Sequence, residues 1–139
     1  MVGLPTRRFG RTELQIPLLS LGGMRFQQSW SDLPSADITS ESQLNLEETL
    51  QQAVDHGFHH VETARHYGSS ERQLGWALPR CMDSRRILQS KVPPREDPDA
   101  FEAELNLSFE RLNCRRLDLL GIHGINLPEH LHQTLRPGG

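Results

Sequence analysis

Four polar residues of this sequence can form a proton-donating site: Glu62, Tyr67, Lys91 and His123. A phenol is a weak acid, and an adjacent ammonium favours its ionised form, so a tyrosine beside a lysine suits general acid–base catalysis. A buried lysine needs a counter-ion to stay charged, and Glu62 can supply one. His123 can donate a hydrogen bond to a carbonyl oxygen and fix its direction. The chemistry that this set predicts is proton transfer at a carbonyl.

Each of these residues also has a purely structural interpretation. Glu62 and Lys91 can form an ordinary ion pair. Tyr67 can pack in the turn before Gly68, and His123 can be a hydrogen-bonded core residue. The catalytic interpretation therefore depends on whether the fold brings all four side chains together.

The sequence places three of these residues at the ends of predicted strands. Apolar runs bounded by turn residues predict four strands, at residues 16–23, 58–64, 86–92 and 117–123. Glu62, Lys91 and His123 lie at the ends of the last three, spaced by about 30 residues, the length of one βα unit. Because the ends of parallel strands meet at one edge of a sheet, we expect these side chains to share a pocket there.

Helical patterns separate the strands. Ser40 with Gln43 has the form of a capping box, and Gly57 is suited to end the helix that follows. A second, shorter helix is expected from Ser70 to Pro79.

Two more helix starts follow. Asp97 before a proline is a typical N-cap, and Asn126 with a proline two residues on predicts a last helix ending at Leu135. Strand and helix thus alternate four times, which is typical of an α/β fold with parallel strands. A small hairpin at about residues 7–16, with Gly10 at its turn, precedes the βα units at about residues 16–139. We expect a single domain over residues 1–139.

Composition excludes several other classes. The chain has 139 residues and a net charge of −3. Its basic pairs, Arg7–Arg8, Arg85–Arg86 and Arg115–Arg116, are scattered, so we expect solvated arginines and no nucleic-acid partner. No apolar run approaches the length of a membrane span, and the N-terminus has no apolar signal core. We expect no membrane partner and a cytoplasmic protein.

The metal-ligating residue types are poorly arranged for a metal. Cys81 and Cys114 are too far apart in sequence for a C-x-x-C motif. Four histidines crowd together, at His56, His59, His60 and His66. Strand alternation directs His59 and His60 to opposite faces, so we predict no metal site, although a metal-dependent hydrolase is an alternative that these histidines raise.

Several motifs resemble those of a known family. HVETARHYGSSERQLGWAL is similar to the D-T-A-x-x-Y-G-x-S-E-x-x-L-G-x-A-L segment of the aldo-keto reductases. SKV resembles their T-K-V strand end, and DLLGIHG resembles their D-L-x-x-I-H strand end. FGRTELQIPLLSLGGMRF is similar to their opening hairpin and first strand. The motifs occur in the family's order and cover nearly the whole chain.

This resemblance implies a (β/α)8 TIM barrel and NADP(H)-dependent reduction of an aldehyde or ketone, or oxidation of the alcohol. By the resemblance, Tyr67 would be the general acid or base, Lys91 the ammonium that favours its phenolate, and His123 the residue that orients the carbonyl. Glu62 stands where the family has aspartate. The segment Gly23, Met24 and Arg25 would line the cofactor or substrate end of the pocket.

Two departures from the family pattern bear on activity. Glu62 is one methylene longer than aspartate, or about 1.5 Å, and a misplacement on the order of 1 Å can cost about 100-fold in rate. A complete barrel also needs roughly 250 residues, so we expect this chain to be the N-terminal half of one. The alternative is an inactive half-barrel or interaction fragment, which can self-associate through exposed strand edges.

Overall fold

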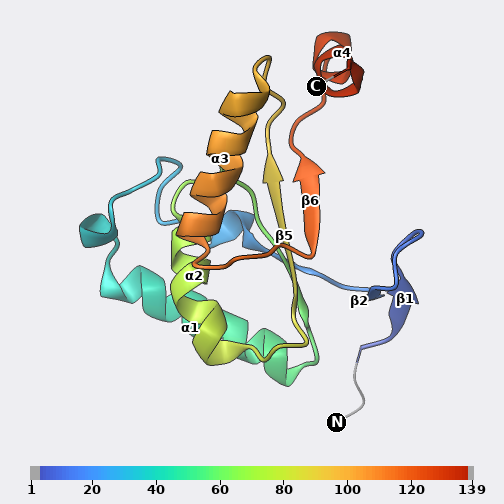
Figure 1. Ribbon diagram of the computed structural model, residues 1–139. Coiled ribbons are helices and arrows are strands. Elements are labelled where there is room, and N and C mark those ends of the chain that lie inside the picture. Colours follow the sequence, from blue (N-terminus) through green and yellow to red (C-terminus); the bar gives the residue numbers. More distant parts are fainter. Residues whose placement is uncertain (1–3, 138–139) are drawn as a thin grey trace.

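The computed structural model describes residues 4–137, which form a parallel sheet and a separate hairpin (Figure 1). The sheet has the order β3 (Leu21–Gly22), β4 (His60–Glu62), β5 (Ile87–Val92) and β6 (Leu119–Ile122), and all neighbouring strands are parallel. Strands β1 (Thr6–Arg8) and β2 (Gln15–Pro17) pair antiparallel. Gly10 lies in their turn with φ of 56°, as expected for a glycine turn position.

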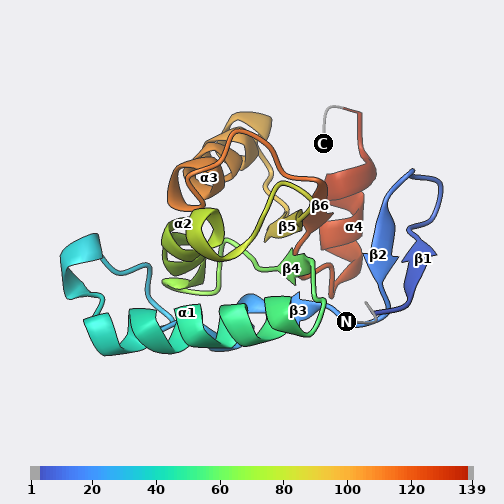
Figure 2. The ribbon, with the colours of Figure 1, turned by 90° about the horizontal axis from the view of Figure 1, so that it is seen from below.

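Residues 4–137 also form four α-helices, of which the last follows β6, and two short 3₁₀ turns. They are α1 (Ser40–Asp55), α2 (Ser70–Cys81), α3 (Pro98–Arg111) and α4 (Pro128–Leu135), with η1 (Gly23–Arg25) and η2 (Ser35–Asp37) between β3 and α1. Helices α1, α2 and α3 lie along one side of the sheet, and the hairpin lies on the other (Figure 2). Helix α4 lies beyond the end of β6 (Figure 1). The predicted alternation of strand and helix is confirmed.

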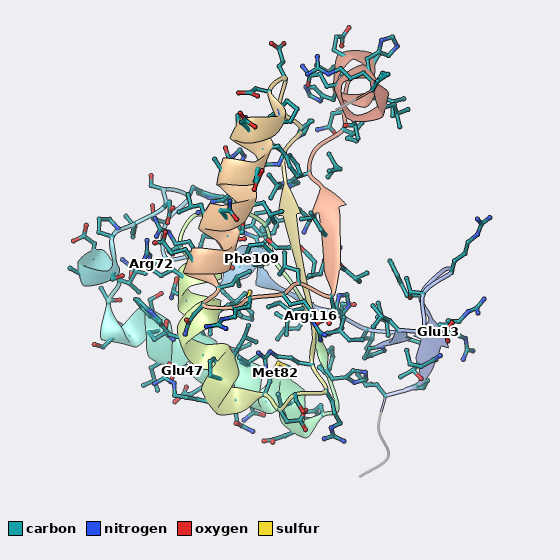
Figure 3. All side chains as sticks on the ribbon, viewed as in Figure 1. Glu13, Glu47, Arg72, Met82, Phe109 and Arg116 are labelled. Atoms are coloured by element: carbon teal, nitrogen blue, oxygen red, sulfur yellow. The ribbon has the colours of Figure 1, made fainter. Side chains whose placement is uncertain are left out.

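The core fills the space between the sheet and helices α1, α2 and α3. Its fully buried side chains include Leu46, Leu50, Val61, Leu74, Leu78 and Leu112. Met82, directly after α2, packs against the same cluster (Figure 3). A Cβ added at Gly75 would meet the Arg111 carbonyl oxygen at 2.2 Å, so only glycine lets α2 and α3 approach this closely. The core is therefore one layer, on the helix side of the sheet.

The first predicted strand is wrong in its extent. Residues 16–23 were expected as one buried strand, but they contribute the end of β2 and the two-residue β3, with Leu18 and Leu19 exposed between them. The Leu18 N–H bonds to the Pro5 carbonyl oxygen instead of to the parallel sheet. Apolar composition alone predicted a strand here, and the turn from hairpin to sheet interrupts it.

Three helix ends differ from the prediction. Thr39, not Ser40, caps α1, because its hydroxyl accepts the Ser42 N–H at 3.2 Å. Helix α2 continues past Pro79 to Cys81, and the Met82 N–H still bonds to the Leu78 carbonyl oxygen at 3.0 Å, so the proline removes one hydrogen bond without ending the helix. Leu127, not Asn126, is the N-cap of α4. The predicted Asp97 cap of α3 is confirmed.

A membrane-spanning helix and a metal site can be assessed only within the residues that the structure describes. Within residues 4–137, no helix has the length and apolarity that a membrane crossing needs. The same residues contain no cluster of three or more ligating side chains that could hold a metal ion. The single domain over residues 1–139 stays a prediction, and residues 1–3 and 138–139 lie outside the described part.

Candidate active site

Glu62 and Tyr67 come from one strand and the loop that follows it. Glu62 is the last residue of β4. The loop then turns sharply, with the Tyr67 N–H bonded to the Ala64 carbonyl oxygen at 3.0 Å and Gly68 at φ of 52°. A Cβ at Gly68 would lie 1.7 Å from the Ser29 carbonyl oxygen, so glycine is required both by the backbone and by the neighbouring loop. This turn fixes the tyrosine at the carboxyl end of the sheet.

Lys91 reaches the same end of the sheet from β5. Its ammonium forms an ion pair with the Glu62 carboxylate and donates a second hydrogen bond to the Thr63 carbonyl oxygen at 2.9 Å. Gly121 lies opposite Lys91 in β6, and a Cβ there would stand 3.0 Å from the lysine Cγ. The absence of a side chain at Gly121 thus leaves room for the lysine stem. The predicted counter-ion for Lys91 is present even with the longer Glu62.

The tyrosine ring lies between the lysine and the histidine. Lys91 Nζ is 4.9 Å from the centre of the Tyr67 ring. The rings of Tyr67 and His123 meet edge to face, with centres 5.4 Å apart and an interplanar angle of 89°. His123 follows β6 directly, and its N–H bonds to the Val92 carbonyl oxygen at 2.8 Å. The fold therefore brings together all four residues singled out in the sequence.

The environment of His123 favours its neutral imidazole. Burial lowers the pKa of His123, and the nearby charge of Lys91 lowers it further, while Glu62 acts in the opposite direction. His66 also contributes, since its ring centre lies 6.4 Å from that of His123. A neutral imidazole can donate one hydrogen bond to a substrate oxygen without bringing another positive charge beside Lys91.

The predicted cofactor segment lies at the neighbouring strand end. Gly23, Met24 and Arg25 form η1, directly after β3. Gly23 is buried, and a Cβ there would approach the Glu62 carbonyl oxygen to 2.9 Å, so this glycine serves the packing of β3 on β4. Met24 is 38% exposed, and Arg25 is also exposed. Met24 and Arg25 are thus the members of the segment that a ligand can reach.

Sequence reasoning missed a buried polar network behind the tyrosine loop. Arg65 forms an ion pair with Glu71, and the other carboxylate oxygen of Glu71 accepts the Ser90 hydroxyl at 2.6 Å. Arg65 also contacts Asp32 at 2.8 Å, which ties residues 26–39 to the tyrosine loop. Burial raises the pKa of the Glu71 carboxyl, and Arg65 opposes that shift. The network holds the backbone on both sides of Tyr67.

One signal for this network was present in the sequence. Glu71 is part of the S-S-E segment that follows Tyr67, and a charged residue on the inward face of a short helix needs a partner. The identity of that partner depends on Asp32, Arg65 and Ser90 meeting in three dimensions. Spacing along the chain does not contain that information.

The crowded histidines do not converge. His60 is buried and lies between the Ser20 hydroxyl, 2.7 Å from Nδ1, and the Gln89 side-chain oxygen, 3.1 Å from Nε2. His59 instead lies near the Gln15 carbonyl oxygen, and His66 is exposed near Glu104. The two neighbouring histidines thus have different partners, and the hypothesis of a metal-dependent hydrolase gains no support from the part of the chain described.

Parallel βα units with a polar cluster at the carboxyl ends of their strands are typical of (β/α) barrel folds. The profile of the aldo/keto reductase family matches residues 18–136. The chain belongs to this family. Comparison with curated proteins gave no match.

Several solved structures share this fold. An aldo-keto reductase, PA4992, from Pseudomonas aeruginosa superposes with a TM-score of 0.74 at 23% identity, over 96% of this chain and 53% of its own. An aldo-keto reductase from Klebsiella pneumoniae, solved with NADPH, gives 0.61 at 27% identity, over 96% and 44%. The thermostable aldo-keto reductase Tm1743 gives 0.68 at 26%, over 93% and 47%.

The chain spans about half the length of these relatives. With the family match and the parallel sheet, this makes its fold a partial (β/α)8 barrel of four βα units behind an N-terminal hairpin. The predicted fold class and family are both confirmed.

Proposed function

We propose that this chain carries the proton-transfer site of an NADP(H)-dependent carbonyl reductase, which reduces an aldehyde or ketone or oxidises the alcohol. The observation that carries the proposal is the convergence of Glu62, Lys91, Tyr67 and His123 from three successive strand ends. A plain ion pair would not require a phenol and an imidazole beside it. On this proposal the chain contributes the N-terminal half of the barrel to the enzyme.

In this reaction Tyr67 donates its phenolic proton to the substrate oxygen as the carbonyl carbon accepts a hydride. NADPH, when bound, supplies that hydride. The ammonium of Lys91 stabilises the phenolate that remains, and the ion pair with the Glu62 carboxylate holds the ammonium in place. The neutral His123 donates a hydrogen bond that directs the substrate oxygen toward Tyr67. The reverse sequence oxidises an alcohol, with the phenolate as the base.

Met24 and Arg25 fit a dinucleotide at the end of β3. The exposed Met24 offers an apolar contact to a flat ring, and the exposed Arg25 offers a guanidinium that can pair with an acidic group of the cofactor. Among residues 4–137, Arg25 forms no ion pair. This free guanidinium, beside the catalytic cluster, supports a role of the segment in cofactor binding.

The test is hydride transfer from NADPH to a panel of aldehydes. It uses the 139-residue chain, alone and joined to the part of the Klebsiella relative that it does not match. We expect activity in the joined protein, and Tyr67→Phe, which keeps the ring but removes the proton, should lower it by about 100-fold or more. His56→Gln, at the exposed end of α1, is the control and should leave the rate unchanged. Equal rates in the Tyr67→Phe and unsubstituted proteins would contradict the proposal.

Glu62 is tested in the same assay. If its extra methylene misplaces the lysine, Glu62→Asp should raise the rate, by up to about 100-fold. The ion pair that Glu62 forms with Lys91 instead supports a lysine already in position, so we expect a change of less than about tenfold. A much larger gain in rate would show that the longer side chain of Glu62 misplaces Lys91.

The second candidate is an inactive half-barrel that acts through its edges. It is favoured by the sheet order, because β3 and β6 each have a neighbour on one side only within the described residues. An unpaired strand edge is a template for another chain, so we propose self-association through these edges. Sedimentation of the 139-residue chain with an NADPH titration separates the candidates. Self-association without cofactor binding supports the half-barrel, and micromolar NADPH binding contradicts it.

A further inference from the structure

Two of the three basic pairs, scattered in sequence, lie side by side in the fold. Arg85–Arg86 precede β5 and Arg115–Arg116 precede β6, and these strands are parallel neighbours. Their starting ends lie opposite the catalytic cluster, and Arg116 is labelled at the foot of β6 in Figure 3. A cavity of about 400 Å³ opens between them. Arg85, Arg115 and Arg116 are exposed to solvent near strand starts, as expected, but the fold brings the two pairs to one end of the sheet.

The carboxylates nearby do not neutralise all of this charge. Arg85 pairs with Asp83 at 2.7 Å, and Arg116 pairs with Asp118 at 2.9 Å. The other oxygen of Asp118 accepts the Leu88 N–H at 2.9 Å. These pairs leave Arg86 and Arg115 without a carboxylate partner among residues 4–137. The cavity thus has a net positive charge.

Arg86 is the most informative residue of this cavity. It is half-buried, and the one hydrogen bond of its guanidinium within the described residues runs from Nη1 to the Asp83 carbonyl oxygen at 3.2 Å. A guanidinium has five N–H donors, so most of those of Arg86 have no protein acceptor. A partly desolvated charge without a counter-ion is unfavourable, and an anion in the cavity would remove that cost.

The loop after α3 shapes the other wall. Asn113 adopts φ of 48°, a left-handed turn that ends α3 and directs the chain back toward β6. After this turn Asn113, Cys114 and Arg115 line the cavity, together with Ser84. The lining therefore combines two unpaired guanidinium groups with neutral hydrogen-bonding groups.

We propose that this cavity is a binding site for a phosphate-bearing anion, held by Arg86 and Arg115. The planar donor fork of arginine matches the paired oxygens of a phosphate group, and two forks from different loops favour a diphosphate over a monoanion. The site lies at the amino ends of the strands, away from Tyr67 and Lys91, and does not depend on the proposed reductase function. Its occupant would stabilise the junction of β5, β6 and α3.

Thermal unfolding with inorganic pyrophosphate tests this site, with sodium chloride added to keep the ionic strength constant. We expect a saturable rise in Tm, because a ligand that binds only the folded state stabilises it. R86Q and R115Q should each weaken binding by about tenfold or more. R85Q is the matched control, since Arg85 pairs with Asp83 outside the cavity, and its affinity should stay within about twofold. Inorganic phosphate and ADP, as further arms, separate a simple phosphate preference from recognition of a nucleotide.

Alkylation of the two cysteines gives a second measurement on the unsubstituted protein. Cys114 lines this cavity and a neighbouring one, whereas Cys81 lines a third. Pyrophosphate should slow the reaction of Cys114 with neutral iodoacetamide and leave that of Cys81 unchanged. The proposal is overturned if both thiols respond alike, if Tm follows ionic strength alone, or if R85Q and R86Q bind pyrophosphate equally well.

Discussion

The middle of the sheet and its β6 edge differ in how well their apolar side chains are buried. Under α2 and α3, the side chains of Val61, Leu74 and Leu88 are at most 3% exposed. On β6 and α4, by contrast, five large apolar side chains are 37–73% exposed, namely Leu120, Ile122, Leu127, Leu131 and Leu135. Helix α4 buries none of its residues. The sheet is therefore closely packed at β4 and β5, which form the closed core with α2 and α3, and open to solvent at β6.

The residues of the candidate site come from both of these regions. Glu62, Lys91 and Tyr67 belong to β4, β5 and the loop supported by the buried Arg65–Glu71 pair. His123 follows the open strand β6. The closed core thus positions Tyr67 and the Glu62–Lys91 ion pair, whereas His123 depends on the least protected strand. We expect His123 to be the first of the four residues to lose its position when the protein is destabilised.

The largest expected effect compares two leucines on helices. Leu74→Ala, in the closed core, should lower the free energy of unfolding by about 2–5 kcal/mol, because it leaves a cavity among buried side chains. Leu131→Ala, on α4, should change it by less than about 0.5 kcal/mol. Urea unfolding of both variants measures the contrast. Equal losses would mean that α4 is as well packed as α2.

A second pair of variants tests the contact between α2 and α3. Gly75→Ala would drive a methyl group into the Arg111 carbonyl and should cost about 1–3 kcal/mol, although alanine favours a helix. Gly22→Ala is the control, because a Cβ there meets nothing within 4 Å. Thermal unfolding compares the two. A stabilised Gly75→Ala protein would show that the helices can separate without loss.

The smallest expected effect is the pH dependence of the free energy of unfolding that arises from His60, a buried residue of β4. Burial lowers the pKa of His60 below its reference value of 6.5, so the unfolded chain binds the proton more readily. Its contribution to stability is complete above the unfolded pKa and is lost as the pH falls through the folded one.

Urea unfolding at about pH 7.5 and pH 5.5 measures this contribution. The unsubstituted protein should be less stable at the lower pH, and His60→Gln should reduce the difference. His56→Gln, at the exposed end of α1, should leave the difference unchanged. The same pH dependence with and without His60 would assign it to other groups.

The sequence was sufficient for the order of the βα units and for the strand ends that meet at the site. The reason is that periodic apolar runs and helix caps, such as Asp97 before Pro98, act locally. It was not sufficient for β3, since an apolar run does not reveal that Leu18 and Leu19 remain exposed. Nor did it reveal the buried Arg65–Glu71 pair, because its outer partners lie far away along the chain.

The same limit explains the arginine cavity. Arg86 and Arg115 are near neighbours only because β5 and β6 pair in parallel. The sequence shows each basic pair separately, whereas their combined positive charge at one site depends on how the sheet pairs the two strands.

The most direct test of the central claim, that the four residues form one coupled site, is the titration of His123 by NMR. Lys91→Met should raise the pKa of His123, because it removes a nearby positive charge, and Glu62→Gln should lower it, because it removes a negative one. The exposed imidazoles of His56 and His132 are internal references, whereas His60 is not, because Glu62 also acts on its pKa. Shifts of opposite sign at His123 in these two variants, with His56 and His132 unmoved, are the predicted result. A His123 titration that neither substitution moves would contradict the account.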